Sequence, residues 1–190
     1  MYIYLLISVA IIFGNDIDSL QQSQFEKLPN HFLKDLNNKK RSIDEFIVDG
    51  PVAVNFWFLA CEPCKKEMKY LSLFNEKYAK YGFKVLSINT DNSRTINRVK
   101  PFVNSQKYSF EVLSDPKSLF FRKIGGKICP TLLLVNKNGD IIKKNIGYNP
   151  GDEIKLEQEI VELLLPEIQS DTTLTDTSIL KLLNHFDTNK

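Results

Sequence analysis

An apolar run leads directly into a closely spaced pair of cysteines in the stretch Pro51-Val-Ala-Val-Asn-Phe-Trp-Phe-Leu-Ala-Cys-Glu-Pro-Cys-Lys-Lys-Glu67. The run from Pro51 to Leu59 is too apolar for a half-exposed strand, so it predicts a strand at the centre of a sheet covered on both faces. Lys65 to Tyr81 shows helical periodicity and is followed by Gly82, a common helix terminator. A Cys-x-x-Cys motif is therefore expected where a buried strand passes into a helix.

Cys61 and Cys64 form a dithiol at the start of this predicted helix, and the placement indicates redox chemistry. The positive end of a helix stabilises negative charge, and the thiolate form of cysteine is the form that attacks disulfides. A bridge between two cysteines so close in sequence constrains the unfolded chain very little, so a purely structural disulfide is disfavoured. The motif therefore predicts a redox-active pair.

Metal binding is an alternative use of these cysteines. A structural zinc site needs four ligands, but outside the motif the chain offers only Cys129, His31 and His185, which are distant in sequence. Thiolates of Cys61, Cys64 and Cys129 would suit Cu(I) or an iron–sulfur cluster in a metal-delivery protein. Stoichiometric metal retention after purification would identify such a protein. We assign no metal ligand and no cofactor.

Two segments together resemble a known family. They are Asn55-Phe-Trp-Phe-Leu-Ala-Cys-Glu-Pro-Cys-Lys-Lys-Glu67 and Cys129-Pro-Thr-Leu-Leu-Leu-Val-Asn-Lys-Asn-Gly139, and they are similar to the TlpA/ResA-like branch of the thioredoxin superfamily. The resemblance extends from about Asn30 to Leu165. It implies a thioredoxin-like α/β fold, in which helices flank a central mixed β-sheet, with an N-terminal β-hairpin extension. The residues alone predict only an α/β domain.

Hydrophobic patterns predict the remaining elements. Phe83 to Asn89 forms a second buried strand, parallel to the first because a helix connects the two. Asp91 or Ser93 is expected to cap the next helix, which Pro101 kinks or shortens. The other predicted elements are two short hairpin strands (His31–Leu36 and Lys39–Ile43), a strand (Phe110–Leu113), a short helix (Pro116–Ile124), a second hairpin (Thr131–Asn136 and Ile141–Ile146) and a closing helix (Asp152–Leu165).

The order of residues within the motif indicates their roles. Cys61 is expected to be the more exposed cysteine, to attack a substrate disulfide and to form the mixed disulfide, which Cys64 then resolves. Pro63 restricts the first helical turn and lacks an N–H that a helix start does not need. Glu62 is exposed at the helix start, and we expect it to influence substrate preference and reduction potential.

Glu67 lies three residues after Cys64 and therefore on the same face of the predicted helix. A partly buried carboxyl group at this position would have a raised pKa and would be able to carry protons during disulfide exchange. The resemblance likewise implies that a glutamate here influences the acidity of the cysteines. An ordinary exposed helix glutamate is the alternative interpretation.

Trp57, Cys129 and Pro130 are the other candidate site residues. Trp57 either shields the dithiol or simply packs in the core. The resemblance implies that the bond before Pro130 is cis and that the preceding backbone binds an extended substrate segment beside Cys61, as in β-strand addition. Cys129 and Ala60 are departures from the family pattern, in which threonine or valine and a second tryptophan are common. We expect Cys129 to act as a small apolar residue; an alternative resolving thiol and a metal ligand are the other interpretations.

Composition and the chain ends set wider limits. At 190 residues and 43% apolar content, the chain fits one domain at residues 28–166 with appendages at 1–27 and 167–190. Tyr2 to Phe13 is almost continuously apolar but short for a membrane span, so it suits a secretory signal or an uncleaved anchor, with packing in the core as the alternative. Ile179 to Phe186 predicts a loosely packed terminal helix or, alternatively, a partner-binding one. A net charge of +2 gives no electrostatic case for nucleic acid.

Together these patterns predict an extracytoplasmic thiol–disulfide oxidoreductase, either periplasmic or anchored to the membrane and facing outward. We expect a monomer that reduces disulfides in protein substrates and is recharged by a membrane-bound electron donor. Cytochrome c maturation is implied by the resemblance alone. A peroxiredoxin-type peroxidase is an alternative, disfavoured because the chain has no isolated peroxidatic cysteine. The direction of electron transfer does not follow from the motif, because Cys-x-x-Cys proteins span roughly 150 mV in reduction potential.

Overall fold

Seven strands form one mixed β-sheet at the centre of residues 25–170, the part of the chain that the computed structural model describes. The strand order is β2-β1-β5-β4-β3-β6-β7, and only the β3–β4 and β4–β5 pairs are parallel. The predicted N-terminal apolar segment and the predicted terminal helix lie outside the described residues. The strands are β1 (Phe32–Asp35), β2 (Lys40–Ser42), β3 (Val52–Trp57), β4 (Lys84–Asn89), β5 (Glu111–Ser114), β6 (Thr131–Val135) and β7 (Ile141–Ile146).

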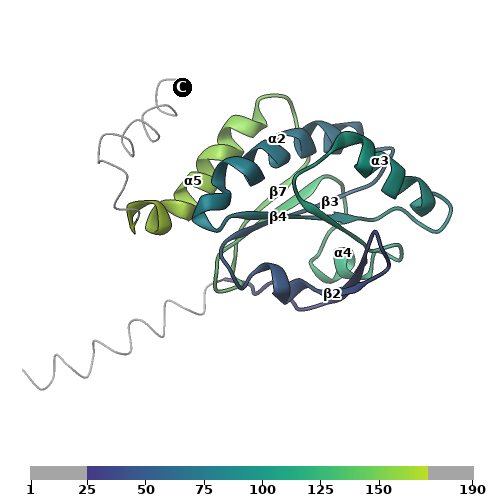
Figure 1. The fold of residues 1–190 in the computed structure, drawn as a ribbon, viewed down its shortest axis with the longest axis horizontal. Helices are drawn as coiled ribbons and strands as arrows, with labels where there is room; N and C mark the ends of the chain where they lie inside the picture. Colours follow the sequence, from purple (N-terminus) through teal and green to yellow (C-terminus); the bar gives the residue numbers. More distant parts are fainter. Residues whose placement is uncertain (1–24, 171–190) are drawn as a thin grey trace, which may run out of the picture.

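Helices cover both faces of this sheet. In Figure 1 the helices α2, α3 and α5 lie on one side of the sheet and α4 lies on the other. The arrangement of a parallel βαβ unit followed by a β-hairpin and a helix agrees with the fold that the resemblance implies. The helices are α2 (Glu62–Tyr78), α3 (Val99–Gln106), α4 (Leu119–Lys123) and α5 (Asp152–Ser170), with short 3-10 turns η1 (Ile43–Phe46), η2 (Ala79–Tyr81) and η3 (Ile96–Arg98).

Strand β3 is buried along its whole length, as its composition predicts. Ala53 and Trp57 belong to the hydrophobic cluster under α2, α3 and α5, whereas Val54 and Phe56 belong to the cluster on the opposite face. This alternation follows from the two-residue period of a strand. Because β3 lies between β4 and β6, both of its edges are paired and its C-terminal end is held rigidly where the cysteine motif begins.

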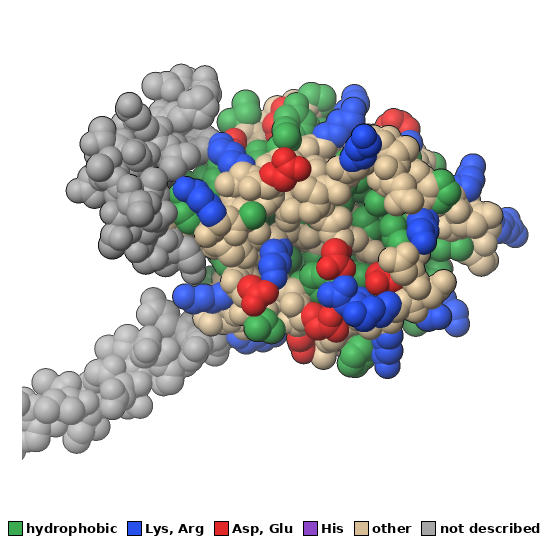
Figure 2. Space-filling view, viewed as in Figure 1, with side chains coloured by type: hydrophobic (Ala, Val, Ile, Leu, Met, Phe, Trp, Pro, Cys, Tyr) green, Lys and Arg blue, Asp and Glu red, His purple; other side chains and the backbone are tan. Residues whose placement is uncertain are grey.

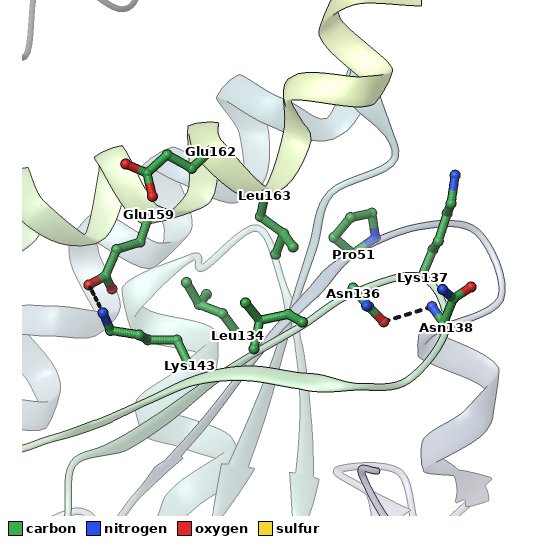
Figure 3. A pocket seen from close by; sticks show the side chains of 10 residues that line it. Pro51, Leu134, Asn136, Lys137, Asn138, Lys143, Glu159, Glu162 and Leu163 are labelled. Carbon is green, nitrogen blue, oxygen red and sulfur yellow. Dashed lines mark hydrogen bonds and ion pairs between the residues drawn. The ribbon is translucent and has the colours of Figure 1, made fainter. Parts of the chain in front are cut away.

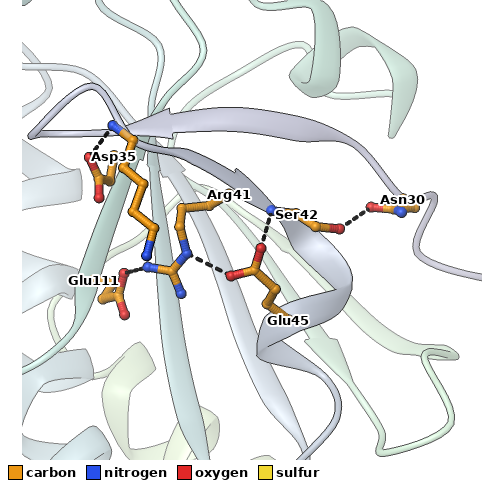
Figure 4. Close-up of polar contacts among 7 residues, drawn as sticks. Asn30, Asp35, Arg41, Ser42, Glu45 and Glu111 are labelled. Atoms are coloured by element: carbon orange, nitrogen blue, oxygen red, sulfur yellow. Dashed lines mark hydrogen bonds and ion pairs between the residues drawn. The ribbon is translucent and has the colours of Figure 1, made fainter.

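The N-terminal hairpin of β1 and β2 extends the sheet past β5, and this prediction is confirmed. Arg41 on β2 forms ion pairs with Glu45 and Glu111, each with an N–O distance of 2.6 Å (Figure 4). Exposed ion pairs each contribute roughly 0–1 kcal/mol, less than the roughly 1.5–3 kcal/mol gained by burying a large apolar side chain. The buried side chains of Leu33 and Ile43 are therefore the main anchors of the hairpin.

The start of α3 differs from the prediction. Neither Asp91 nor Ser93 caps it, because the chain first forms η3 and α3 then begins at Val99 without a side-chain cap. The Asp91 carboxylate is unavailable as a cap because it already accepts hydrogen bonds from three donors, one of them in the loop before Cys61. Pro101 lies in the first turn of α3, where its missing N–H breaks no intrahelical hydrogen bond.

The short helix α4 also begins later than predicted, at Leu119 and not at Pro116. Asp115 accepts hydrogen bonds from the backbone nitrogens of Leu119 (2.8 Å) and Phe121 (2.9 Å). This carboxylate satisfies two of the N–H groups that a helix start leaves unpaired. The first turn therefore forms beyond the proline.

The closing helix α5 continues to Ser170, so the predicted end at Leu165 is wrong. Pro166 lies inside the helix, where a proline commonly costs about 3 kcal/mol. The continuation places Ile168 four residues after Leu164 on the same helix face, and both join the core cluster. Burial of a side chain such as Ile168 contributes roughly 1.5–3 kcal/mol, which offsets much of this cost.

Candidate active site

Cys61 and Cys64 are joined by a disulfide at the junction of β3 and α2. The Cα atoms are 5.3 Å apart, and the backbone nitrogen of Cys64 donates a hydrogen bond to the sulfur of Cys61 at 3.3 Å. Cys61 is 5% exposed and Cys64 is fully buried. Cys61 is therefore the more accessible sulfur, as expected, although the difference is small.

The first turn of α2 places the other motif residues. Pro63 lies at the start of the helix, where it removes no intrahelical hydrogen bond. The Glu62 side chain is exposed and forms an ion pair with Lys65 at 2.7 Å. The hydrogen bond from Lys65 lowers the pKa of the Glu62 carboxyl. Glu62 therefore carries a negative charge on the surface beside the disulfide.

Glu67 is buried, so the exposed-glutamate alternative is wrong for this residue. Its side chain is 3% exposed, and its Oε2 atom has no hydrogen-bond partner among the described residues. Burial raises the pKa of the Glu67 carboxyl to about 8, and the charge of Asp152 adds to the rise. A carboxyl group with this pKa is largely protonated at neutral pH and is suited to exchange a proton during thiol chemistry.

A cleft connects Glu67 with the surface. Its volume is about 240 Å³, and it lies between β7 and the start of α5. Glu67 and Leu132 line its buried end, whereas Asp152 and Lys155 are exposed lining residues. Water can enter a polar cavity of this size, so Glu67 has a route for proton exchange apart from the surface around Cys61.

Trp57 packs in the core and is fully buried, in the same cluster as Cys61 and Cys64. Its ring lies 5.7 Å from the ring of Phe102. Trp57 is therefore a core aromatic, and its shielding of the dithiol stays a prediction.

Asn55 and Ser87 are buried polar residues on β3 and β4 that the sequence analysis missed. They are paired neighbours on β3 and β4, both fully buried, and their side-chain polar atoms have no partner among the described residues. By strand alternation they face α2, the helix that carries Glu67. Asn55 could have been noticed as the one amide inside the apolar run before the motif.

The Cys129–Pro130 peptide bond is cis, as the resemblance implies. Strand β6 begins at the next residue, and Thr131 pairs with Phe56 near the end of β3. Cys129 therefore lies beside the strand end that leads to the disulfide. It is half-buried, contacts both core clusters, and is a free cysteine.

Burial raises the pKa of the Cys129 thiol to about 11. A hydrogen bond with Thr90 partly opposes this shift, and the charge of Glu67 adds to it. Cys129 is therefore a neutral thiol at physiological pH. Within residues 25–170, no three His, Cys, Asp or Glu side chains are arranged to hold a metal ion, and His31 instead stacks on Phe120 with ring centroids 5.3 Å apart.

A larger hollow lies on another part of the described surface. It has a volume of about 520 Å³ and lies between α5 and the β6–β7 hairpin. Figure 3 shows residues that line it, among them the apolar Leu134 and Leu163 and the Lys143–Glu159 ion pair. No cysteine lines it.

On the face shown in Figure 2, basic and acidic side chains are interspersed. Among the helices that the structure describes, none is both long and apolar enough to cross a membrane.

A disulfide at the junction of β3 and α2, with a cis-proline just before the neighbouring strand β6, is typical of a thiol–disulfide oxidoreductase of thioredoxin-like fold. Residues 23–160 match the family model described as Redoxin, and the chain belongs to that family. It is similar to the thiol-disulfide oxidoreductase ResA of Bacillus thuringiensis (strain Al Hakam), with 30% identity over 130 residues, covering 68% of this chain and 73% of the relative.

Two further proteins show the same likeness. ResA of Bacillus subtilis (strain 168) is 29% identical over 125 residues, covering 66% of this chain and 68% of that protein. The crystal structure of a putative thiol:disulfide interchange protein DsbE from Chlorobium tepidum superposes with a TM-score of 0.68 and 27% identity, covering 74% of this chain and 96% of that chain. These likenesses support the predicted class of enzyme and its fold.

Proposed function

We propose that this enzyme is an extracytoplasmic reductant of disulfides in other proteins. The observation that carries the proposal is the Cys61–Cys64 pair at the start of α2, one helical turn before the buried Glu67. The described structure is the oxidised state, which is the state that remains after one round of substrate reduction.

The reaction begins with the reduced dithiol. The Cys61 thiolate attacks one sulfur of the substrate disulfide, so a Cys61–substrate disulfide forms and the other substrate sulfur leaves as a thiolate. The Cys64 thiolate then attacks the Cys61 sulfur and releases the second substrate thiolate. Two electrons pass from the dithiol to the substrate, and its two protons end on the substrate thiols. The ionised fraction of Glu67, on the same helix face as Cys64, would accept the proton from Cys64 as that thiol becomes a nucleophile.

The surroundings of the dithiol favour the reducing direction. Strong oxidants of this kind have a reduced form stabilised as a thiolate of very low pKa. Here Cys64 is fully buried, and burial disfavours a thiolate at this position, just as it disfavours the ionised form of Glu67 on the same helix face. The reduced state is therefore less stabilised, which makes the pair a better electron donor.

Location, electron donor and pathway complete the proposal. The apolar segment Tyr2–Phe13 supports export or anchoring, and the resemblance of the cysteine motif to the ResA-like pattern supports a place in cytochrome c maturation. A membrane-bound dithiol protein would recharge the disulfide, and the enzyme would act as a monomer. Fractionation of cells that express the full chain tests the location.

Two measurements test the function. Insulin reduction should be lost in Cys61→Ser, whereas Cys64→Ser should accumulate mixed disulfides with substrate. A redox titration of the wild type should give a potential more negative than about −180 mV, the value for protein disulfide isomerase. Full activity in Cys61→Ser would overturn the catalytic assignment, and a less negative potential would indicate an oxidant or isomerase.

A further inference from the structure

We propose that Asp91 is a positioning residue of the active site, which holds the loop before Cys61 in the conformation that makes Cys61 reactive. Asp91 follows β4 and lies far from the cysteine motif in sequence. Its carboxylate is 6% exposed, so it is a buried acidic side chain outside the chemistry assigned above. The inference rests on the proposed attack by Cys61.

The Asp91 carboxylate joins three segments. Its Oδ2 atom accepts hydrogen bonds from the backbone nitrogen of Leu59 at 2.7 Å and from the side-chain amide of Asn89 at 2.9 Å. Its Oδ1 atom accepts one from the Thr95 hydroxyl at 2.5 Å. The Asn89 and Thr95 contacts fix the carboxylate on the end of β4, so the bond to Leu59 fastens the active-site loop to the sheet.

The loop beyond Leu59 transmits this attachment to the sulfur. The backbone nitrogen of Cys61 donates to the carbonyl of Phe58 at 3.0 Å, which closes a turn around Leu59. That turn sets where the Cys61 side chain points, and the sulfur is placed to accept the hydrogen bond from the Cys64 nitrogen at 3.3 Å. An N–H group aimed at the Cys61 sulfur stabilises its thiolate in the reduced enzyme.

A second attachment lies on the adjacent residue. The Thr90 backbone nitrogen and hydroxyl both donate to the carbonyl of Trp57, at 2.8 and 3.1 Å. These bonds hold the end of β3 but do not reach the loop itself. Asp91 is therefore the residue at the end of β4 that is hydrogen-bonded to the loop between β3 and Cys61.

The test compares Asp91→Asn with Asp91→Ala. Both variants lack the negative charge, but asparagine keeps an oxygen acceptor for the Leu59 N–H, so the difference between them reports the attachment. Reduced Asp91→Ala should react about fivefold more slowly than Asp91→Asn with dithiobis(nitrobenzoate), the loss expected for one hydrogen bond. The Cys61 pKa, from thiolate ultraviolet absorbance, should be higher in Asp91→Ala. Equal rates and equal Cys61 pKa values in the two folded variants would overturn the proposal.

Asp115 supplies a matched control. It follows the neighbouring strand β5, is 2% exposed, and accepts two backbone hydrogen bonds at the start of α4. Asp115→Ala and Asp115→Asn should differ in stability and not in the Cys61 rate or pKa. A rate difference as large as that at Asp91 would show a general packing effect and overturn the proposal.

A measurement on the wild type covers the case in which Asp91→Ala does not fold. The Leu59 amide should exchange with deuterium much more slowly than the amide of Ala60, an exposed loop residue. Equally fast exchange at both would overturn the attachment. Activity retained in Cys61→Ser is a separate outcome, because it contradicts the proposed function and leaves the Leu59 exchange result unchanged.

Discussion

At the scale of single residues, Glu67 shows how burial changes the chemistry of a common side chain. Its carboxyl is buried with one oxygen unpaired among the described residues, and its pKa is raised to about 8. Glu62, five positions earlier on the same helix, is exposed and has a lowered pKa because Lys65 donates a hydrogen bond to it. Two glutamates of one helix therefore have opposite shifts, decided by depth in the fold.

The Glu67 shift predicts a pH dependence of stability. A carboxyl whose folded pKa is raised binds its proton more tightly in the folded state, so stability is full below the ordinary pKa of 4.5 and falls as pH rises toward about 8. The loss over this window is on the order of 5 kcal/mol at most. Glu67→Gln should remove it, as measured by urea unfolding of the oxidised protein across this range.

The control for this experiment is Glu62→Gln, which removes an exposed carboxyl from the same helix. It should keep the wild-type decline in stability. Other groups that titrate between these pH values are shared by all three proteins, so the difference isolates Glu67. A Glu67→Gln protein with the wild-type slope would contradict the raised pKa.

Cys129 carries the second prediction at this scale. Its neutral, half-buried thiol contacts apolar residues of both clusters, so we expect it to act as a small apolar side chain. Cys129→Val should retain most disulfide-reductase activity, within about twofold of the wild type, because valine is similar in size and needs no hydrogen bond. Peptide mapping of the oxidised wild type should find the Cys61–Cys64 bridge as the main species. A major Cys61–Cys129 bridge would instead make Cys129 an alternative resolving thiol.

At the scale of elements, the end of α2 depends on Gly82. The helix passes into η2, and Gly82 follows with φ of 79°, in the left-handed region that favours glycine. A Cβ atom added there would lie 2.7 Å from the backbone oxygen of Asp49. The close approach of these two backbone segments brings the chain from α2 back into the sheet as β4.

Substitution of this glycine tests the close approach. Gly139 is a matched control, because its φ of 82° is nearly the same but an added Cβ would meet nothing within 4 Å. Gly139→Ala should cost about 1 kcal/mol from the backbone conformation alone, and Gly82→Ala at least about twice that. Equal losses of unfolding free energy in the two variants, measured with denaturant, would show that the backbone at Asp49 moves away from the added Cβ without loss of stability.

At the scale of the whole molecule, redox state and stability are coupled. For a reductant, the folded protein favours the disulfide more than the unfolded chain does, so the oxidised form should be the more stable. Each ~30 mV of difference in potential corresponds to ~1.4 kcal/mol. Urea unfolding with and without dithiothreitol measures this difference, and the Cys61→Ser/Cys64→Ser double variant should unfold identically in both conditions. A reduced form more stable than the oxidised form would mark an oxidant.

Local patterns predicted much of this architecture. The apolar run before the motif, the helical period after it and the paired segments Thr131–Asn136 and Ile141–Ile146 identified β3, α2 and the β6–β7 hairpin, because strand and helix periods are properties of consecutive residues. They failed at α5, whose extension past Pro166 depends on the burial of Ile168 against other elements. Helix ends are decided by such contacts as much as by the residues at the end.

The sequence by itself determined the redox motif at a strand–helix junction and the helix face shared by Cys64 and Glu67, since both follow from spacing along one chain. Only the tertiary structure decided that Glu67 is buried near Asp152, and that Asp91 binds the Leu59 N–H across 32 residues instead of capping a helix. A carboxyl group is chemically the same wherever it stands in a sequence. Its pKa and its hydrogen-bond partners depend on which distant segments the fold packs around it, and the local periodicity of the sequence does not contain that information.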